Sequence, residues 1–119
     1  MFESWFTTTT SDLVAVKRSP EIQQKVDMET ADLALYHYDS CMFCARVRKA
    51  IATLNLKIEL RDVMRDAKHR RDLEQGGGRS TVPCLRIGRG EDAKWMYESA
   101  DIIAYLAKRF GENKGATAT

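Results

Sequence analysis

The sequence LALYHYDSCMFC, residues 33–44, joins an apolar run to two cysteines three residues apart. The apolar run predicts a buried strand over Leu33 to Tyr38, and the helical spacing of the apolar residues after it predicts a helix that begins at the cysteines. Cys41 then lies where backbone N–H groups have no intrahelical partner and the helix dipole is positive. These groups stabilise a thiolate, so we expect Cys41 to be a nucleophile and Cys44 to close a disulfide with it.

Two cysteines at this spacing are also half of a zinc site, which needs four ligands. The chain has three cysteines, Cys41, Cys44 and Cys84. Neither histidine has the spacing of a fourth ligand, because His37 lies on the predicted strand and His69 on a polar surface helix. We therefore expect no metal. Cys84 is expected to be a packed core thiol, and a regulatory disulfide with Cys41 is the less favoured alternative.

The composition excludes several classes of protein. The chain has 119 residues, enough for one domain, and its net charge of +2 is too small to indicate a nucleic-acid partner. An odd number of cysteines argues against a secreted disulfide framework and favours a reducing compartment, the cytoplasm. No apolar stretch is long enough to span a bilayer, and there is no convincing signal peptide. Phe2, Trp5 and Phe6 leave a weak membrane contact open, but a frayed N-terminus is favoured.

The chain divides into an N-terminal arm (residues 1–31), a domain (residues 32–111) and a flexible tail (residues 112–119). In the arm, Ser19 and Pro20 are a helix-start signal, and they predict a short helix from Pro20 to about Thr30. Its apolar contacts are few: Ile22, Val26 and Met28.

Within the domain, the helix after the cysteines is expected to bury Phe43, Val47, Ala50, Ile51 and Leu54, to point Arg46, Arg48 and Lys49 outward, and to stop at Asn55. A strand over 57–61 follows. A polar helix over 65–75 comes next, with Ala67 and Leu73 inward and with Gly76-Gly77-Gly78 as its end.

Two more strands, over 84–87 and 94–97, are joined by a glycine turn, and a last helix is capped by Ser99 and stopped by Gly111. The order β-α-β-α-β-β-α predicts an α/β fold. Its first β-α-β unit requires parallel strands with a right-handed crossover, and the short turn makes the last two strands a hairpin. We expect a four-stranded mixed sheet flanked by helices.

Three motifs now stand in order: residues 35–44, Thr81-Val82-Pro83, and residues 97–102 (YESADI). Together they resemble those of a glutaredoxin of the thioredoxin superfamily, over about Leu33 to Phe110. The resemblance implies a thioredoxin-like fold and a catalytic, redox-active pair formed by Cys41 and Cys44.

The resemblance also implies a glutathione site. Pro83 would be cis, and the Val82 backbone would pair with the cysteinyl part of glutathione as an added strand. The backbone N–H groups of Ser99 and Ala100, with the Ser99 hydroxyl, would hold the γ-glutamyl carboxylate at a helix start. Glu98 or Asp101 would meet the ammonium group. The Glu-Ser pair resembles the N-terminal domain of glutathione transferases as well, whose large helical domain is absent from these 119 residues.

The sequence departs from the glutaredoxin pattern at two places. Met42 stands where proline is usual, and the lysine often found just before the active cysteine is missing. The glycyl carboxylate of glutathione then needs another cation. Residues 46–79 hold ten Lys/Arg against five Asp/Glu, an excess of +5, and the candidates are Arg79, Lys68, Arg46 and Arg71.

The resemblance implies that the chain is a glutathione-dependent thiol–disulfide oxidoreductase. Cys41 would reduce glutathione mixed disulfides by itself, and the reduction of protein disulfides would need both Cys41 and Cys44. Its partners would be glutathione and glutathionylated or disulfide-bonded proteins. The alternatives are a glutathione-ligated iron–sulfur cluster module, an interaction module with idle cysteines, and a glutathione transferase, which is ranked lower because of length. Phe43 and Tyr38 could line the groove, whereas Trp95 is expected to pack in the hairpin.

Overall fold

The central strand β1 (Leu33–His37) is buried along its whole length, as its unbroken apolar run requires. The computed structural model describes residues 15–111, whose strands lie in the order β2-β1-β3-β4. Strand β2 (Glu59–Asp62) is parallel to β1, whereas β3 (Cys84–Ile87) and β4 (Lys94–Met96) continue the sheet with antiparallel pairing. These pairings confirm the predicted α/β class, the parallel first unit and the hairpin, and each strand shifts by no more than two residues from its expected bounds.

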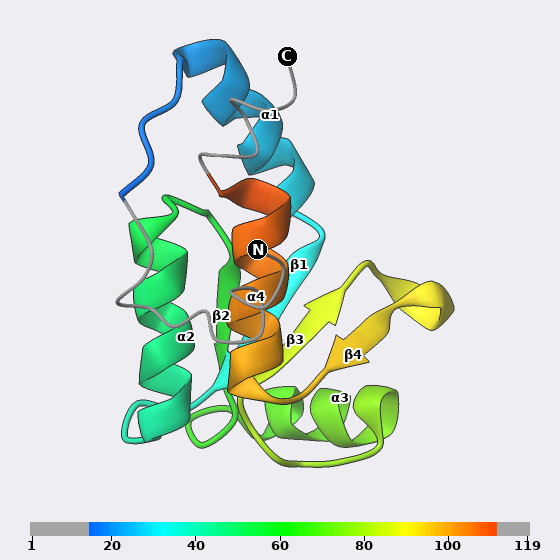
Figure 1. The fold of residues 1–119 in the computed structure, drawn as a ribbon. Helices are drawn as coiled ribbons and strands as arrows, with labels where there is room; N and C mark the ends of the chain where they lie inside the picture. The colour runs from blue at the N-terminus through cyan, green and yellow to red at the C-terminus, as the bar shows by residue number, and fades with distance from the viewer. Residues whose placement is uncertain (1–14, 112–119) are drawn as a thin grey trace.

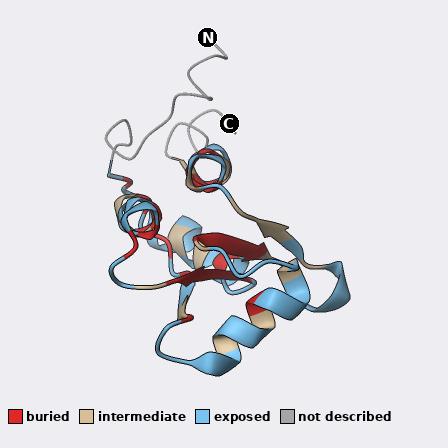
Figure 2. Ribbon diagram, turned by 90° about the horizontal axis from the view of Figure 1, so that it is seen from below, coloured by how far each residue is buried: buried red, intermediate tan, exposed pale blue. Residues whose placement is uncertain are grey.

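Helices cover the sheet unequally. α2 (Met42–Thr53) and α4 (Ser99–Phe110) lie side by side on one face, and α3 (Ala67–Gly77) lies on the other (Figure 1). Figure 2 shows the buried strands between these layers and the largely exposed surface of α3. The cluster under α2 and α4 is large and aliphatic, whereas the cluster under α3 is small and consists of Ala34, Tyr36, Val63, Leu73 and Cys84.

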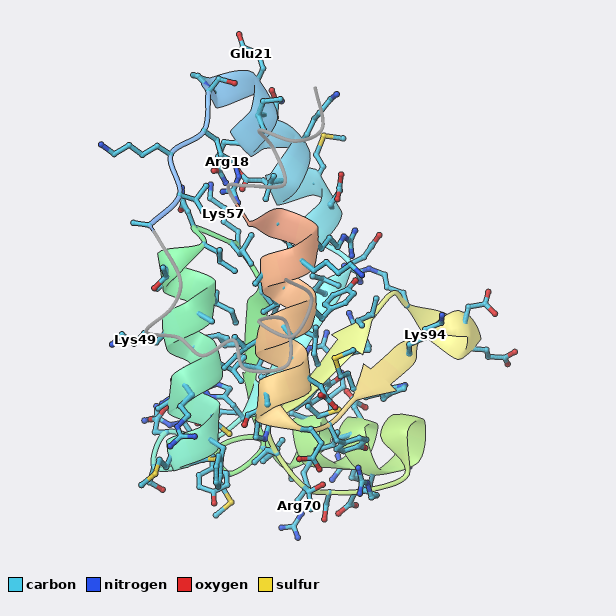
Figure 3. All side chains as sticks on the ribbon, viewed as in Figure 1. Arg18, Glu21, Lys49, Lys57, Arg70 and Lys94 are labelled. Atoms are coloured by element: carbon cyan, nitrogen blue, oxygen red, sulfur yellow. The ribbon has the colours of Figure 1, made fainter. Side chains whose placement is uncertain are left out.

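The described part of the arm is docked on the rest of the domain, with α1 (Pro20–Thr30) at the bounds that the sequence predicts. Val16 is buried in the core under α2 and α4, and its N–H donates to the Thr53 carbonyl at 3.2 Å. Arg18 points inward (Figure 3) and donates to the carbonyl oxygen of Phe110, at 2.7 Å. The arm therefore contacts the C-terminal ends of both α2 and α4.

The expected end of α3 is wrong by two residues. The helix continues through Gly76 and Gly77, and it ends at Gly78, whose φ of +88° is the left-handed conformation that favours glycine. A Cβ atom on Gly76 would overlap the Trp95 ring, and one on Gly77 would overlap the Tyr97 hydroxyl. The two glycines thus let the helix backbone approach β4 closely, so they serve packing and not termination.

Two further expectations about the helices are corrected. Ala67, expected to point inward, is exposed at the first position of α3, and Leu73 is the buried residue of that helix. The frayed N-terminus, its less favoured alternative of a membrane contact through Phe2, Trp5 and Phe6, and the flexible tail all lie outside the described residues. Between residues 15 and 111, no helix is long and apolar enough to cross a membrane.

The close approach of α3 to Trp95 predicts an unusual sign for Gly76→Ala. Alanine favours a helix over glycine by about 1 kcal/mol. Here the overlap with the indole should outweigh that gain and lower the free energy of unfolding by about 1–3 kcal/mol, measured by urea denaturation. The control is Gly76→Ala in a Trp95→Leu background, where the same change should cost little or stabilise. Stabilisation in the wild-type background would contradict the packing described above.

Candidate active site

Three segments of the candidate site lie at one edge of the sheet. Because β1 and β3 are antiparallel and pair Tyr36 with Cys84, the loop after β1 and the Val82-Pro83 segment before β3 meet at the same end. The antiparallel pairing of β3 with β4 brings the end of β4, and hence Glu98 at the start of α4, to that end too. The topology thus brings together the three motifs that the sequence separates.

Cys41 is the N-cap residue of α2, as the sequence predicts. Its Sγ accepts a hydrogen bond from the Cys44 N–H at 3.2 Å, and its own N–H donates to the Tyr38 carbonyl at 3.2 Å. The side chain is 9% exposed. The sulfur therefore occupies the position of the oxygen in an ordinary helix cap, where a negative charge is favoured.

Cys44 lies one turn into α2 and is fully buried. Burial raises the pKa of its thiol to about 12, and the hydrogen bond and charge of Cys41 act in the same direction. Cys44 is therefore a neutral thiol near pH 7. Both cysteines are free of disulfides in this structure.

Arg48 holds the loop that leads to Cys41, so the expectation that it points outward is wrong. Its guanidinium lies 2.9 Å from His37 Nδ1 and donates to the carbonyl oxygens of Tyr38, at 3.3 Å, and Asp39, at 3.2 Å. Arginine remains protonated and can act here as a donor alone, so His37 Nδ1 is the acceptor. Helical periodicity locates the Cα atom, and it does not reveal that a long side chain folds back.

The Val82–Pro83 peptide bond is cis, as the resemblance implies. Pro83 is buried, and within residues 15–111 the N–H and C=O of Val82 have no hydrogen-bond partner. Cys84 is fully buried beneath this segment, and burial raises the pKa of its thiol to about 12. The expectation of a packed core thiol at Cys84 is confirmed.

The start of α4 differs from expectation at one residue. Ser99 is the first helical residue and does not cap the helix; Glu98 takes the N-cap position with φ +20° and without a side-chain cap. In the described part of the chain the Ser99 hydroxyl has no hydrogen-bond partner. The N–H groups of Ser99 and Ala100 lie before Ile102, whose N–H makes the first backbone hydrogen bond of α4. A partly exposed hydroxyl and two free N–H groups are thus available to an anion.

Of the four candidate cations, Arg79 has the firmest link to this edge. Its guanidinium lies 4.2 Å from the centre of the Tyr97 ring, and the Tyr97 hydroxyl exchanges hydrogen bonds with the Arg79 backbone, at 3.3 and 3.0 Å. Arg46 instead lies over Phe43, 5.3 Å from the ring centre. Phe43 is 53% exposed, so its predicted burial in α2 is wrong and its role as a groove residue remains a prediction.

Two expectations about aromatic and metal-ligating residues can be compared with the structure. Trp95 of the hairpin packs between β1 and α3, with its ring centre 5.5 Å from that of Tyr36 and its ring against Gly76. Among the described residues, no group of three or more His, Cys, Asp or Glu side chains is arranged to hold a metal ion.

A family model described as "Glutathione S-transferase, N-terminal domain" matches residues 35–114. The chain belongs to this family. Glutathione S-transferase N-terminal domains share the glutaredoxin-like fold of the thioredoxin superfamily, which agrees with the strand order above and with the three motifs. The predicted thioredoxin-like fold is therefore confirmed.

Individual relatives include a glutaredoxin and two glutathione transferases. Glutaredoxin 2 of Escherichia coli K12 is 31% identical over 83 residues, which are 67% of this chain and 35% of the relative. The Leishmania glutathione transferase TDR1 matches with a TM-score of 0.57 and 31% identity, over 71% of this chain and 19% of that one. Glutathione transferase E6 of Drosophila melanogaster matches with a TM-score of 0.54 and 28% identity, over 67% and 36%.

The chain spans about a third of the length of the curated relatives that it matches. Length therefore does not separate a glutathione transferase from a glutaredoxin, because both kinds of relative extend well beyond the aligned region. The lack of a large helical domain in these 119 residues therefore does not disfavour a glutathione transferase.

The contact between Arg48 and His37 predicts a dependence of stability on pH. Burial, and then the Arg48 charge, lower the pKa of His37 below its ordinary value of 6.5. Below pH 6.5 His37 binds a proton in the unfolded chain but stays neutral in the folded chain until its lowered pKa is reached. The free energy of unfolding should therefore fall as pH drops from 7 toward 5. Urea denaturation across this window measures it. His37→Gln should flatten the slope and His69→Gln should keep it; an equal slope in all three proteins would contradict the assignment.

Proposed function

We propose that this chain is the glutathione-binding and catalytic part of a thiol–disulfide oxidoreductase that reduces glutathione mixed disulfides. The observation that carries the proposal is the position of Cys41 Sγ, which accepts the Cys44 N–H at the start of α2. A helix start stabilises a negative charge, and the thiolate is the attacking species in thiol–disulfide exchange. Family membership and the similarity to glutaredoxin 2 support glutathione as the co-substrate.

In this proposal the glutathione peptide lies along the edge described above. The unpartnered N–H and C=O of Val82, next to Pro83, pair with the cysteinyl residue. The Ser99 and Ala100 N–H groups hold the γ-glutamyl carboxylate at the start of α4, and Glu98 meets the ammonium group.

Arg79 supplies the cation for the glycyl carboxylate. Its stacking on Tyr97 keeps the guanidinium near the segment before β3. Its charge also reaches the buried Cys84 thiol directly behind Pro83. Lys68 and Arg71, the candidates on α3, are exposed, and their side chains have no such link to this edge.

The reaction consists of two exchanges. The Cys41 thiolate attacks the glutathione sulfur of a mixed disulfide, the old S–S bond breaks, and the protein thiolate leaves. A second glutathione thiolate then attacks the glutathione sulfur held on Cys41. Oxidised glutathione forms and the Cys41 thiolate returns, so one S–S bond breaks and one forms in total. The protein sulfur goes from the disulfide to the thiol level, and the sulfur of the second glutathione goes from the thiol to the disulfide level. The released protein thiolate takes up a proton from water.

Cys44 acts in the second branch of the proposal, the reduction of protein disulfides. Once a substrate protein is attached to Cys41 through a disulfide, the effect of the Cys41 charge on the Cys44 pKa disappears, but the larger effect of burial remains. Cys44 is then still protonated near pH 7 and attacks slowly. The raised pKa of Cys44 therefore supports the one-cysteine route over the two-cysteine route.

A glutathione transferase is the second candidate, because the matched family model and two similar structures are transferase domains. In that case the same edge would hold glutathione while its thiolate attacks an electrophile. Conjugation of 1-chloro-2,4-dinitrobenzene, compared with reduction of a mixed disulfide, separates the two. The iron–sulfur alternative has no support among these relatives. A cytoplasmic location remains a proposal that rests on the odd number of cysteines.

The proposed mechanism predicts different outcomes for the two cysteines. In a glutathione-coupled assay with a mixed disulfide, Cys41→Ser should abolish reduction, because a hydroxyl cannot supply the nucleophile. Cys44→Ser should keep that activity and lose reduction of protein disulfides. Cys84→Ser is the matched control and should keep both. Activity that survives in Cys41→Ser would refute Cys41 as the nucleophile, and a wild-type protein without activity would favour the idle-cysteine module.

The proposed glutathione contacts predict changes in KM. Arg79→Gln and Ser99→Ala each remove one contact to a carboxylate, so each should raise KM for the mixed disulfide several-fold to about tenfold with a smaller change in kcat. Arg71→Gln, an exposed arginine on α3, is the control. Steady-state kinetics in glutathione and in mixed disulfide measure the effect. If Arg71→Gln raises KM as much as Arg79→Gln does, general charge attraction replaces the specific contact.

A further inference from the structure

A groove of about 590 Å³ lies on the α3 face of the sheet, beside the β3–β4 turn. None of the candidate active-site residues lines it. Its volume is within the range of small-molecule sites in proteins. The side chains that decide its chemistry are Tyr36, Arg61, Asp72, Arg86, Glu91 and Trp95.

The groove exists because α3 covers a part of that face. Alternation along β3 places Cys84 and Arg86 on the same side of the sheet. Cys84 packs in the apolar cluster with Leu73 of α3, whereas Arg86 lies beyond it, next to the turn. Where α3 covers this face of the sheet, an apolar cluster packs beneath the helix. Beyond α3, near the β3–β4 turn, the same face carries the buried Arg86.

The two arginines of the groove differ in their partners. Arg61 lies against the Glu59 carboxylate, with Nε and Nη2 at 3.0 and 3.1 Å from its oxygens, and Nη1 donates to the Tyr36 hydroxyl at 2.7 Å. Arg86 is 8% exposed, and its Nε donates to the Gly88 carbonyl at 2.8 Å. Its Nη2 is buried without a hydrogen-bond partner, and in the described chain no carboxylate lies within 4.0 Å of its guanidinium.

A buried guanidinium with no carboxylate in contact is costly, because the desolvation of its charge is compensated only by more distant charges such as Glu59. An anion in the groove would supply that compensation, and a carboxylate matches the fork of a guanidinium. The Trp95 ring, stacked near Tyr36, gives the groove an apolar wall. Asp72 lies 3.9 Å from Arg61 Nη1. Asp72 and Glu91, both in the groove, disfavour a ligand with two negative charges and attract an ammonium group.

We propose that this groove binds a small zwitterion of the amino-acid class, with its carboxylate on Arg86, its ammonium toward Asp72 and Glu91, and its apolar part against Trp95. The site is separate from the cysteine edge, so the inference does not depend on the proposed function.

Three probes of similar size test the charge requirement: phenylalanine, 3-phenylpropionate and phenethylamine. A Trp5→Phe background leaves Trp95 as the single tryptophan, so its fluorescence reports the groove. Phenylalanine should give a saturable change and bind most tightly, with phenethylamine weaker by about tenfold or more. No saturable change with any probe up to millimolar concentrations would overturn the proposal. Tighter binding of 3-phenylpropionate than of phenylalanine would overturn the zwitterion class.

Variants test the residues. Arg86→Gln should weaken phenylalanine binding by about tenfold or more, with folding checked by circular dichroism. Arg89→Gln is the matched control, because Arg89 is exposed and pairs with Asp32, at 2.9 Å, and it should bind like the parent. If Arg86→Gln does not fold, Glu91→Gln, at the exposed rim of the groove, provides the test instead. It should reduce the ratio of the affinity for phenylalanine to the affinity for 3-phenylpropionate. Unchanged binding in a folded Arg86→Gln, or an unchanged preference in Glu91→Gln, would overturn the assignment.

Discussion

The burial of β1 on both faces is the constraint on which the rest of the structure depends. Five consecutive residues, Leu33–His37, are buried, so each face of the strand needs its own cover. α2 and α4 supply one cover, and α3 with Trp95 and Tyr97 supplies the other. Because the strand is central, the loop that follows it leaves from the most rigid part of the sheet. Arg48 and the bond from the Val63 N–H to the His37 carbonyl, at 2.9 Å, fix the loop where it begins.

The apolar packing under α2 and α4 is more extensive than the packing under α3, and the two candidate sites reflect this difference. Under α2 and α4 the aliphatic core is continuous, and the arm extends it through Val16. A firm base of this kind suits a cysteine whose sulfur has to be held within hydrogen-bond distance of a helix start. Under α3 the cluster is small, and the helix relies on Leu73 and on the backbone contact of its glycines with β4. The hairpin end of that face stays uncovered, and charged side chains occupy it.

The order of helices and strands could be predicted from periodicity and turn residues, because apolar spacing and glycines act locally. The candidate site needed more: nothing local in Val82, Pro83 or Ser99 indicates glutathione, and their roles came from the resemblance to glutaredoxins. Two of the errors share one physical origin, since each concerns how a side chain or backbone meets a partner elsewhere in the chain. Arg48 folds back onto a loop nine residues earlier in the chain, and Gly76 faces an indole nineteen residues later.

The burial of Cys44 and Cys84 has a practical consequence for labelling the protein. Both side chains are fully buried and have thiol pKa values raised to about 12, whereas Cys41 retains 9% of its exposure. Maleimides and similar reagents need an accessible sulfur that ionises readily. The folded chain should therefore take up a single fluorophore or cross-linker, on Cys41, although its sequence contains three thiols. The native protein can be tagged at the proposed catalytic atom without removing any other cysteine.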